Sequence, residues 1–120
     1  MTYAPGALDA LLDAAAGQPF LTQAVAFELV QFLNEEHRRE ATPADVDEAI
    51  RRALVSASEY FANVWFDAGE RGQALLTALA RGRTPPEDAA TYRRLREHDV
   101  LNDAGCFAVP MLERWIRMRG

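Results

Sequence analysis

The sequence contains no lysine and only one cysteine, Cys106, in 120 residues. A single thiol excludes an internal disulfide and a metal cluster built from cysteines. All 13 basic residues are arginine and alanine is abundant, so we attribute the missing lysine to a GC-rich genome rather than to chemistry. The two histidines, His37 and His98, lie far apart in charged surroundings. Because metal-binding histidines are usually closely spaced, we interpret both as surface or helix-end residues.

Long apolar runs are also missing. No stretch approaches the roughly 20 apolar residues that a membrane helix needs, and Met1–Ala16 lacks the basic start of a signal peptide. We therefore expect a cytoplasmic protein with no membrane partner. With 49% hydrophobic and 26% charged residues, the chain has enough apolar surface to form a core.

Catalytic motifs are absent as well. The sequence has no glycine-rich phosphate loop ending in Lys-Ser/Thr, so we do not expect the chain alone to hydrolyse nucleotides. Its acidic groups, Glu35 with Glu36 and Asp45 with Asp47 and Glu48, lie on amphipathic segments at positions expected to face water. We predict no catalytic residue, no metal site and no cofactor for the isolated chain.

Helical periodicity dominates the first part of the chain. Apolar residues recur at helical spacing over 7–16 and again over 20–38. Gly17 ends the first helix, and Pro19 occupies a first-turn position of the second, where its missing N–H has no partner to lose. The apolar stripe of the second helix is broad, which indicates contact on more than one side.

A third helix has a strong start signal. Thr42 is the expected N-cap, Pro43 takes the first helical position, and Asp45 lies in the first turn, where the helix dipole favours a negative charge. The apolar signal then continues through the aromatic run at 60–66. Whether the chain bends or breaks at 56–58 stays open.

The next segments also predict helices. Residues 69–80 form one, closed by a glycine. Thr84 and Glu87 have the spacing of a capping box, in which side chains and backbone amides satisfy each other, so a further helix is expected to run to about His98.

After His98 the periodicity changes. Residues 100–101 and 106–109, separated by a glycine-containing turn, predict a two-stranded β-hairpin. Cys106 alternates with the apolar positions of this hairpin and is expected to be a small buried residue. Helical spacing returns over 111–119. Helix, capped helix, hairpin and closing helix are, in that order, the layout of a winged helix.

A winged helix raises the question of DNA binding. In that interpretation Arg93, Arg94 and Arg96 contact a DNA groove. We favour a solvated helix face, because Glu97 and Asp99 dilute the positive charge and the net charge of the chain is −5. A DNA-binding transcription regulator is the alternative function.

The segment Gly17–Gln23, which reads Gly-Gln-Pro-Phe-Leu-Thr-Gln, resembles the glycine-x-proline start of the lid helix in STAND-type NTPases, relatives of the AAA+ proteins. The Thr42-Pro43 helix start, the aromatic run and the closing apolar residues at 107–115 resemble the same group. The resemblance covers nearly the whole chain. Its motifs are short, so the order of elements is the stronger argument.

This resemblance implies a mainly α fold, with a helical lid subdomain at residues 1–67 and a winged-helix subdomain at residues 68–120. It implies that ATP or ADP binds the parent protein and that Gly17, Gln18 and Pro19 lie near the nucleotide. Glycine lets a backbone approach closely and proline offers a flat apolar face, although a plain helix stop and start uses the same residues.

The resemblance also suggests how such a chain works. We expect a module that relays the nucleotide state of a signalling or defence ATPase by packing, with an upstream nucleotide-binding domain of the same protein as its partner. The segment 20–27 lacks the phosphate-sensing arginine of many AAA+ lids, which favours the STAND subgroup. A scaffold that forms a homo-oligomer through apolar surface is a third interpretation.

Overall fold

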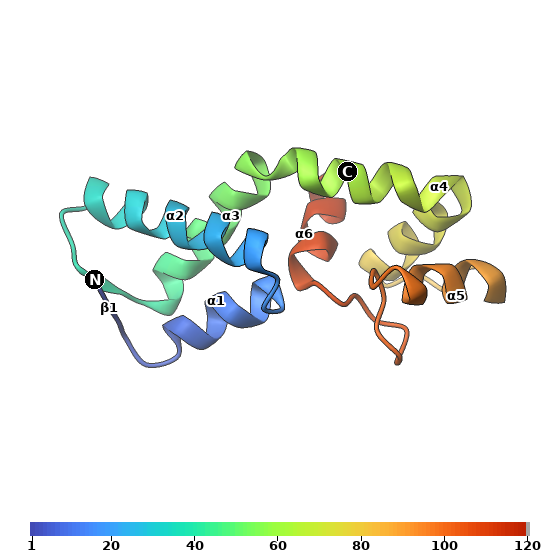
Figure 1. The fold of residues 1–120 in the computed structure, drawn as a ribbon, viewed down its shortest axis with the longest axis horizontal. Helices are drawn as coiled ribbons and strands as arrows, with labels where there is room; N and C mark the ends of the chain where they lie inside the picture. The colour runs from blue at the N-terminus through green and yellow to red at the C-terminus, as the bar shows by residue number, and fades with distance from the viewer. Residues whose placement is uncertain (120) are drawn as a thin grey trace. The chain divides into compact units, whose positions relative to one another are not determined.

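The computed structural model describes residues 1–119, and most of them are helical. They pack as two compact units, Met1–Ser58 and a second that begins at Glu59 (Figure 1). The mainly helical class is therefore confirmed. The assignment of these helices to a lid and a winged helix stays a prediction.

The first unit is a group of three helices with a short sheet. The helices are α1 (Ala7–Ala15), α2 (Pro19–Glu35) and α3 (Pro43–Ser56), and each contacts the other two. Strands β1 (Thr2–Tyr3) and β2 (Glu40–Ala41) pair in parallel. No sequence pattern predicts this sheet, because a two-residue strand is too short to show an alternation of apolar and polar residues.

Side-chain caps fix where α2 and α3 begin. The Gln18 side-chain oxygen accepts a hydrogen bond from the Leu21 amide at 2.8 Å. Thr42 forms a capping box with Asp45: its hydroxyl accepts from the Asp45 amide at 3.2 Å, and the Asp45 carboxylate accepts from the Thr42 amide at 2.9 Å. The predicted N-cap at Thr42 and the predicted position of Pro19 are both confirmed.

The core of the first unit lies between its helices. One face of α2 is almost fully buried, as the helical periodicity predicts, but Phe27 on its other side is 61% exposed, so the expected contact on a second side is not made there within residues 1–119. The buried apolar residues of the three helices are Ala7, Leu11, Ala15, Leu21, Val25, Leu29, Leu33, Val46, Ala49, Ile50, Ala53 and Leu54.

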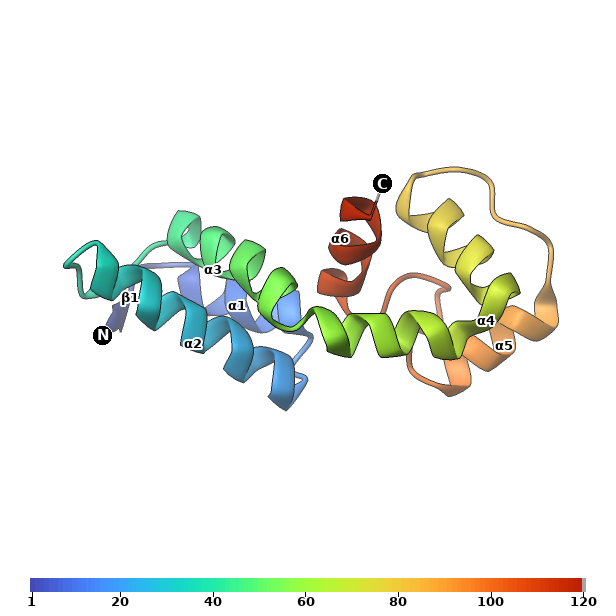
Figure 2. The ribbon, with the colours of Figure 1, turned by 90° about the horizontal axis from the view of Figure 1, so that it is seen from above.

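The second unit is built on α4 (Ser58–Ala80), α5 (Ala89–Glu97) and α6 (Pro110–Met118). Within α4, Gly69 has φ 72° and ψ 176°, so two helical segments meet at a kink. Figure 2 shows the change of direction between the green and yellow parts of α4. The helix is also interrupted at residues 56–58, where the sequence left a bend or a break open, since α3 ends at Ser56 and α4 begins at Ser58.

An aromatic cluster forms part of the second core. The Phe61 side chain is fully buried, and its ring stacks on Trp115 with centroids 6.1 Å apart. Trp65 meets Trp115 edge-on at 6.4 Å. The other large buried side chains of this unit are Leu75, Leu76, Leu95, Leu101, Met111, Leu112 and Ile116.

The predicted capping box at Thr84 and Glu87 is wrong. Helix α5 begins only at Ala89, and Asp88 caps it by accepting hydrogen bonds from the Thr91 amide at 3.1 Å and the Thr91 hydroxyl at 2.6 Å. The reason is the Pro85-Pro86 pair, because a residue that precedes proline is driven away from helical backbone angles.

The predicted hairpin is present in short form: Leu101 and Phe107 make one antiparallel bridge, flanked by hydrogen bonds from the Asn102 amide to the Cys106 carbonyl at 2.8 Å and from the Ala108 amide to the Val100 carbonyl at 3.0 Å. The Asn102 side-chain oxygen accepts from the amides of Ala104 and Cys106, both at 3.0 Å, and so closes a tight turn at the predicted position. Cys106 lies in this turn and is exposed, so the expectation of a buried cysteine is wrong.

Candidate functional site

The turn between α1 and α2 contains the residues that the sequence places near a nucleotide. Gly17 has φ 69°, and a Cβ built on it meets nothing within 4 Å. Pro19 is exposed, whereas Gln18 is half-buried and its side chain caps α2. The turn therefore offers open backbone at Gly17 and an open ring at Pro19, while Gln18 holds the helix. Their proximity to a nucleotide stays a prediction.

The outer face of α2 carries no charge. All of its exposed positions from residue 20 to residue 34 are apolar or neutral polar. Phe27 is 61% exposed and Val30 is 42% exposed, and their i, i+3 spacing places them on one face. These exposed positions are Phe20, Gln23, Phe27, Val30, Gln31 and Asn34. The outer side of a surface helix usually carries charged residues, so we call this set the neutral face of α2 and treat it as a candidate contact surface.

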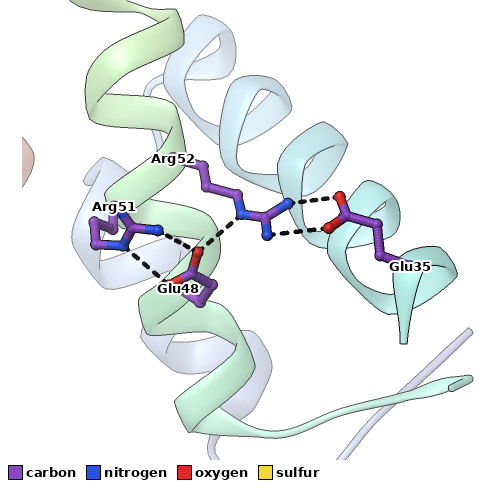
Figure 3. A network of polar contacts seen from close by, with 4 residues as sticks. All are labelled: Glu35, Glu48, Arg51 and Arg52. Carbon is purple, nitrogen blue, oxygen red and sulfur yellow. Dashed lines mark hydrogen bonds and ion pairs between the residues drawn. The ribbon is translucent and has the colours of Figure 1, made fainter. Parts of the chain in front are cut away.

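An ion-pair network joins the end of α2 to α3. Arg52 donates to Glu35 at 2.8 and 3.2 Å and to Glu48 at 2.9 Å, and Arg51 donates to Glu48 at 3.0 and 2.6 Å (Figure 3). The Arg52 guanidinium also lies 4.9 Å from the Phe32 ring centroid. Arg52 thus bridges Glu35 on α2 and Glu48 on α3 at the edge of the buried packing between these two helices.

Three of the acidic residues considered as catalytic candidates, Glu35, Asp45 and Glu48, are engaged by arginines. Hydrogen bonds from Arg51 and Arg52 lower the pKa of Glu48 to about 2. The Arg38 guanidinium, with help from Thr42, lowers the pKa of Asp45 to about 2. Carboxyl groups with such low pKa values stay ionised near neutral pH, which makes them poor general acids.

The expectation that the acidic residues at the start of α3 face water is wrong for Asp45. Its side chain is only 8% exposed and pairs with Arg38 at 2.6 Å. The capping box explains the difference, because it turns the carboxylate back onto the amide of Thr42 at the helix start.

The three arginines proposed for DNA contact do not act alike. Arg94 donates to the carbonyl oxygen of Ala68 at 2.6 Å, at the kink of α4. Arg93 and Arg96 are exposed, and neither forms an ion pair within residues 1–119. Arg94 is thus a contact between α5 and α4, which leaves two arginines on the exposed side of α5.

We expect Arg94→Ala to lower the free energy of unfolding by about 1–2 kcal/mol, because the buried Ala68 carbonyl loses a charged hydrogen-bond donor. Arg93→Ala is the matched control and should change it by less than about 0.5 kcal/mol. Urea denaturation followed by circular dichroism measures both. Equal effects of the two substitutions would show that the Arg94 contact does not stabilise the fold.

His98 lines a cavity of about 380 Å³ with Asp67 and Arg94, and with Val64, Ala68, Leu95 and Val100. Both His98 and Asp67 are exposed, and no hydrogen bond joins them in the described chain. Neither His37 nor Cys106 lines this cavity. The cavity is thus lined by one histidine and one carboxylate, and no serine, threonine or cysteine of residues 1–119 is in its lining.

Within residues 1–119, no group of three or more His, Cys, Asp or Glu side chains is arranged to hold a metal ion. Across that range, none of the helices combines the length and apolar character needed to cross a bilayer. Comparison of the chain with protein-family models, with curated proteins and with solved structures found no match.

Proposed function

We propose that this chain is the regulatory lid and winged-helix part of a STAND-type signalling or defence ATPase. It relays the nucleotide state of an upstream nucleotide-binding domain through packing and performs no bond chemistry itself. The observation that carries the proposal is the neutral face of α2, which starts directly after the open turn at Gly17–Pro19.

The turn and the neutral face form one continuous stretch of chain. A domain that contacts the neutral face also lies against Gly17 and Pro19, so a nucleotide held at its edge can touch both. A partner of this kind explains why exposed residues such as Phe27 and Val30 stand where charged ones are usual.

The relay needs a rigid element behind the contact. The buried packing of α2 on α3 supplies it, and the ion pair between Arg52 and Glu35 adds a contact at the end of α2 (Figure 3). A small displacement of α2 by the nucleotide-binding domain therefore moves α3 with it, since packed helices shift as units.

The DNA-binding alternative has weaker support. Arg94 is used within the fold, which leaves Arg93 and Arg96 beside Glu97 and Asp99. Two arginines give a small phosphate footprint compared with the six to ten contacts, roughly, of strong DNA binders. We therefore place the relay first.

The test measures nucleotide affinities of the full gene product that contains this chain. Phe27→Glu should change the ratio of the ADP and ATP dissociation constants by at least about fivefold, because it puts a charge into the coupling surface. Phe66→Glu is the matched control: Phe66 is 71% exposed, belongs to the second unit and should leave the ratio within about twofold.

Two results count against the proposal. One is a Phe27→Glu protein whose nucleotide affinities equal those of the wild type. The other is robust ATP turnover by the 120-residue chain alone, measured as phosphate release.

A further inference from the structure

A second cavity lies in the second unit. It has a volume of about 350 Å³ and is lined by Trp65, Thr77, Arg81, Arg83, Ile116 and Arg119. Its lining therefore contains three arginines and no carboxylate. This volume falls within the range, roughly 300–1,000 Å³, of small-molecule sites.

The arginines of this cavity lack the acidic partner that several other arginines in the chain have. Arg38, Arg51, Arg52, Arg71 and Arg117 each pair with an aspartate or glutamate. Within residues 1–119, Arg81, Arg83 and Arg119 have no such pair. Three like charges around one concavity repel one another, and an anion bound among them offsets that repulsion.

The cavity also orients one of its donors in advance. The Arg119 guanidinium lies over two indole rings, 4.9 Å from the centroid of Trp115 and 5.4 Å from that of Trp65. A guanidinium can stack on a ring face and still donate hydrogen bonds in its own plane. Stacking reduces the side-chain entropy that binding would otherwise cost.

We propose that this cavity binds a small phosphate-bearing molecule. Arginine donors form a fork that matches the geometry of phosphate oxygens, and the Thr77 hydroxyl adds a further donor at the same site. Ile116 and Trp65 give the cavity an apolar side, which suits the organic part of a phosphate ester. The site shares no residue with the Gly17–Pro19 turn, so it stands independently of the proposed relay function.

The fluorescence of the two tryptophans of the chain, Trp65 and Trp115, provides the readout, because both contact Arg119. Inorganic phosphate and glycerol 3-phosphate are titrated separately into the protein, against sodium chloride at equal ionic strength. We expect a saturable change with the phosphates only. Tighter binding of the ester than of inorganic phosphate would show that the apolar side is used, and the reverse would identify a site for free phosphate.

Arg81→Gln and Arg83→Gln should each weaken phosphate binding at least about fivefold, because each removes one charged donor. Arg93→Gln is the matched control, an exposed and unpaired arginine on α5, and should change it less than about twofold. Circular dichroism confirms that the variants fold. Isothermal titration calorimetry repeats the titration without relying on the tryptophans. Equal responses to phosphate and chloride in both methods, or equal losses in all three variants, would overturn the proposal.

Discussion

Asp45→Ala is expected to lower the free energy of unfolding by roughly 2–4 kcal/mol, which is a large share of the stability of a small protein. The Asp45 carboxylate accepts hydrogen bonds from Arg38 at 2.6 and 3.0 Å and from the Thr42 amide and hydroxyl, both at 2.9 Å. Its removal takes away one half of the capping box at the α3 start, leaves the Thr42 amide without its acceptor and leaves Arg38 without its ion-pair partner. Urea denaturation followed by circular dichroism gives the value.

Asp13→Ala is the matched control, since Asp13 is an exposed aspartate on α1 in the same unit and should change stability by less than about 0.5 kcal/mol. Hydrogen exchange should place the loss of protection caused by Asp45→Ala in the first unit. If the two variants were equally stable, the capping box and its ion pair would contribute nothing measurable.

The same carboxylate predicts a pH dependence. Arg38 lowers the pKa of Asp45 from its ordinary value of 3.8 to about 2 in the folded chain. Because the folded pKa lies below the unfolded one, the contribution is complete above about pH 4 and is lost as the pH falls toward 2. The stability difference between wild type and Asp45→Asn should therefore shrink over this window. A constant difference would contradict the ion pair.

Gly69→Ala is expected to lower the free energy of unfolding by about 2–3 kcal/mol. At φ 72° and ψ 176°, Gly69 adopts a backbone conformation that is almost exclusive to glycine. An alanine there must either accept the strain or straighten α4, which would displace the Ala68 carbonyl from Arg94. Thermal denaturation of the variant measures the loss.

Gly82→Ala gives the comparison for this position. Gly82 has φ 68°, and an added Cβ would meet no atom within 4 Å. Gly82→Ala should therefore lower the free energy of unfolding only by the penalty of the left-handed backbone, about 1 kcal/mol. A Gly69→Ala protein no less stable than Gly82→Ala would mean that the kink is not required by the fold.

The positions of the helices and the first residues of α2 and α3 can be predicted from the sequence, because the residues that determine them are close in sequence. Thr42, Pro43 and Asp45 lie within four residues, and their capping box forms without help from the rest of the chain. The stripe of α2 likewise reflects one helix and its burial. Such features depend on neighbours in sequence, so pattern and structure agree.

Two predictions, the capping box before α5 and the strands after residue 100, depart from the structure for equally specific reasons. Thr84 and Glu87 have capping-box spacing, but the two prolines between them prevent the helical turn that the box needs. The alternation after residue 100 predicts strands, but the pairing is limited to one bridge with its flanking hydrogen bonds, because the Asn102 side chain takes the Cys106 amide that a longer ladder would use. In both places one residue type overrides a pattern that is otherwise correct.

The candidate sites depend on contacts that span the sequence. Trp65, Arg81 and Arg119 line one cavity although they come from separate parts of α4, the following loop and the chain end. Arg94 meets Ala68, 26 positions earlier. No local spacing predicts these meetings. The one sequence signal for the second cavity is the pair Arg81 and Arg83, which has no acidic residue close by.

Hydrogen exchange of the full gene product, with ADP and with a non-hydrolysable ATP analogue, tests the central claim most directly. We predict that amides at the start of α2, from Phe20 through Phe27, exchange at different rates in the two nucleotide states, because the neutral face contacts the nucleotide-binding domain. Identical exchange at these amides with ADP, with the analogue and without nucleotide would contradict the claim that this surface senses the nucleotide.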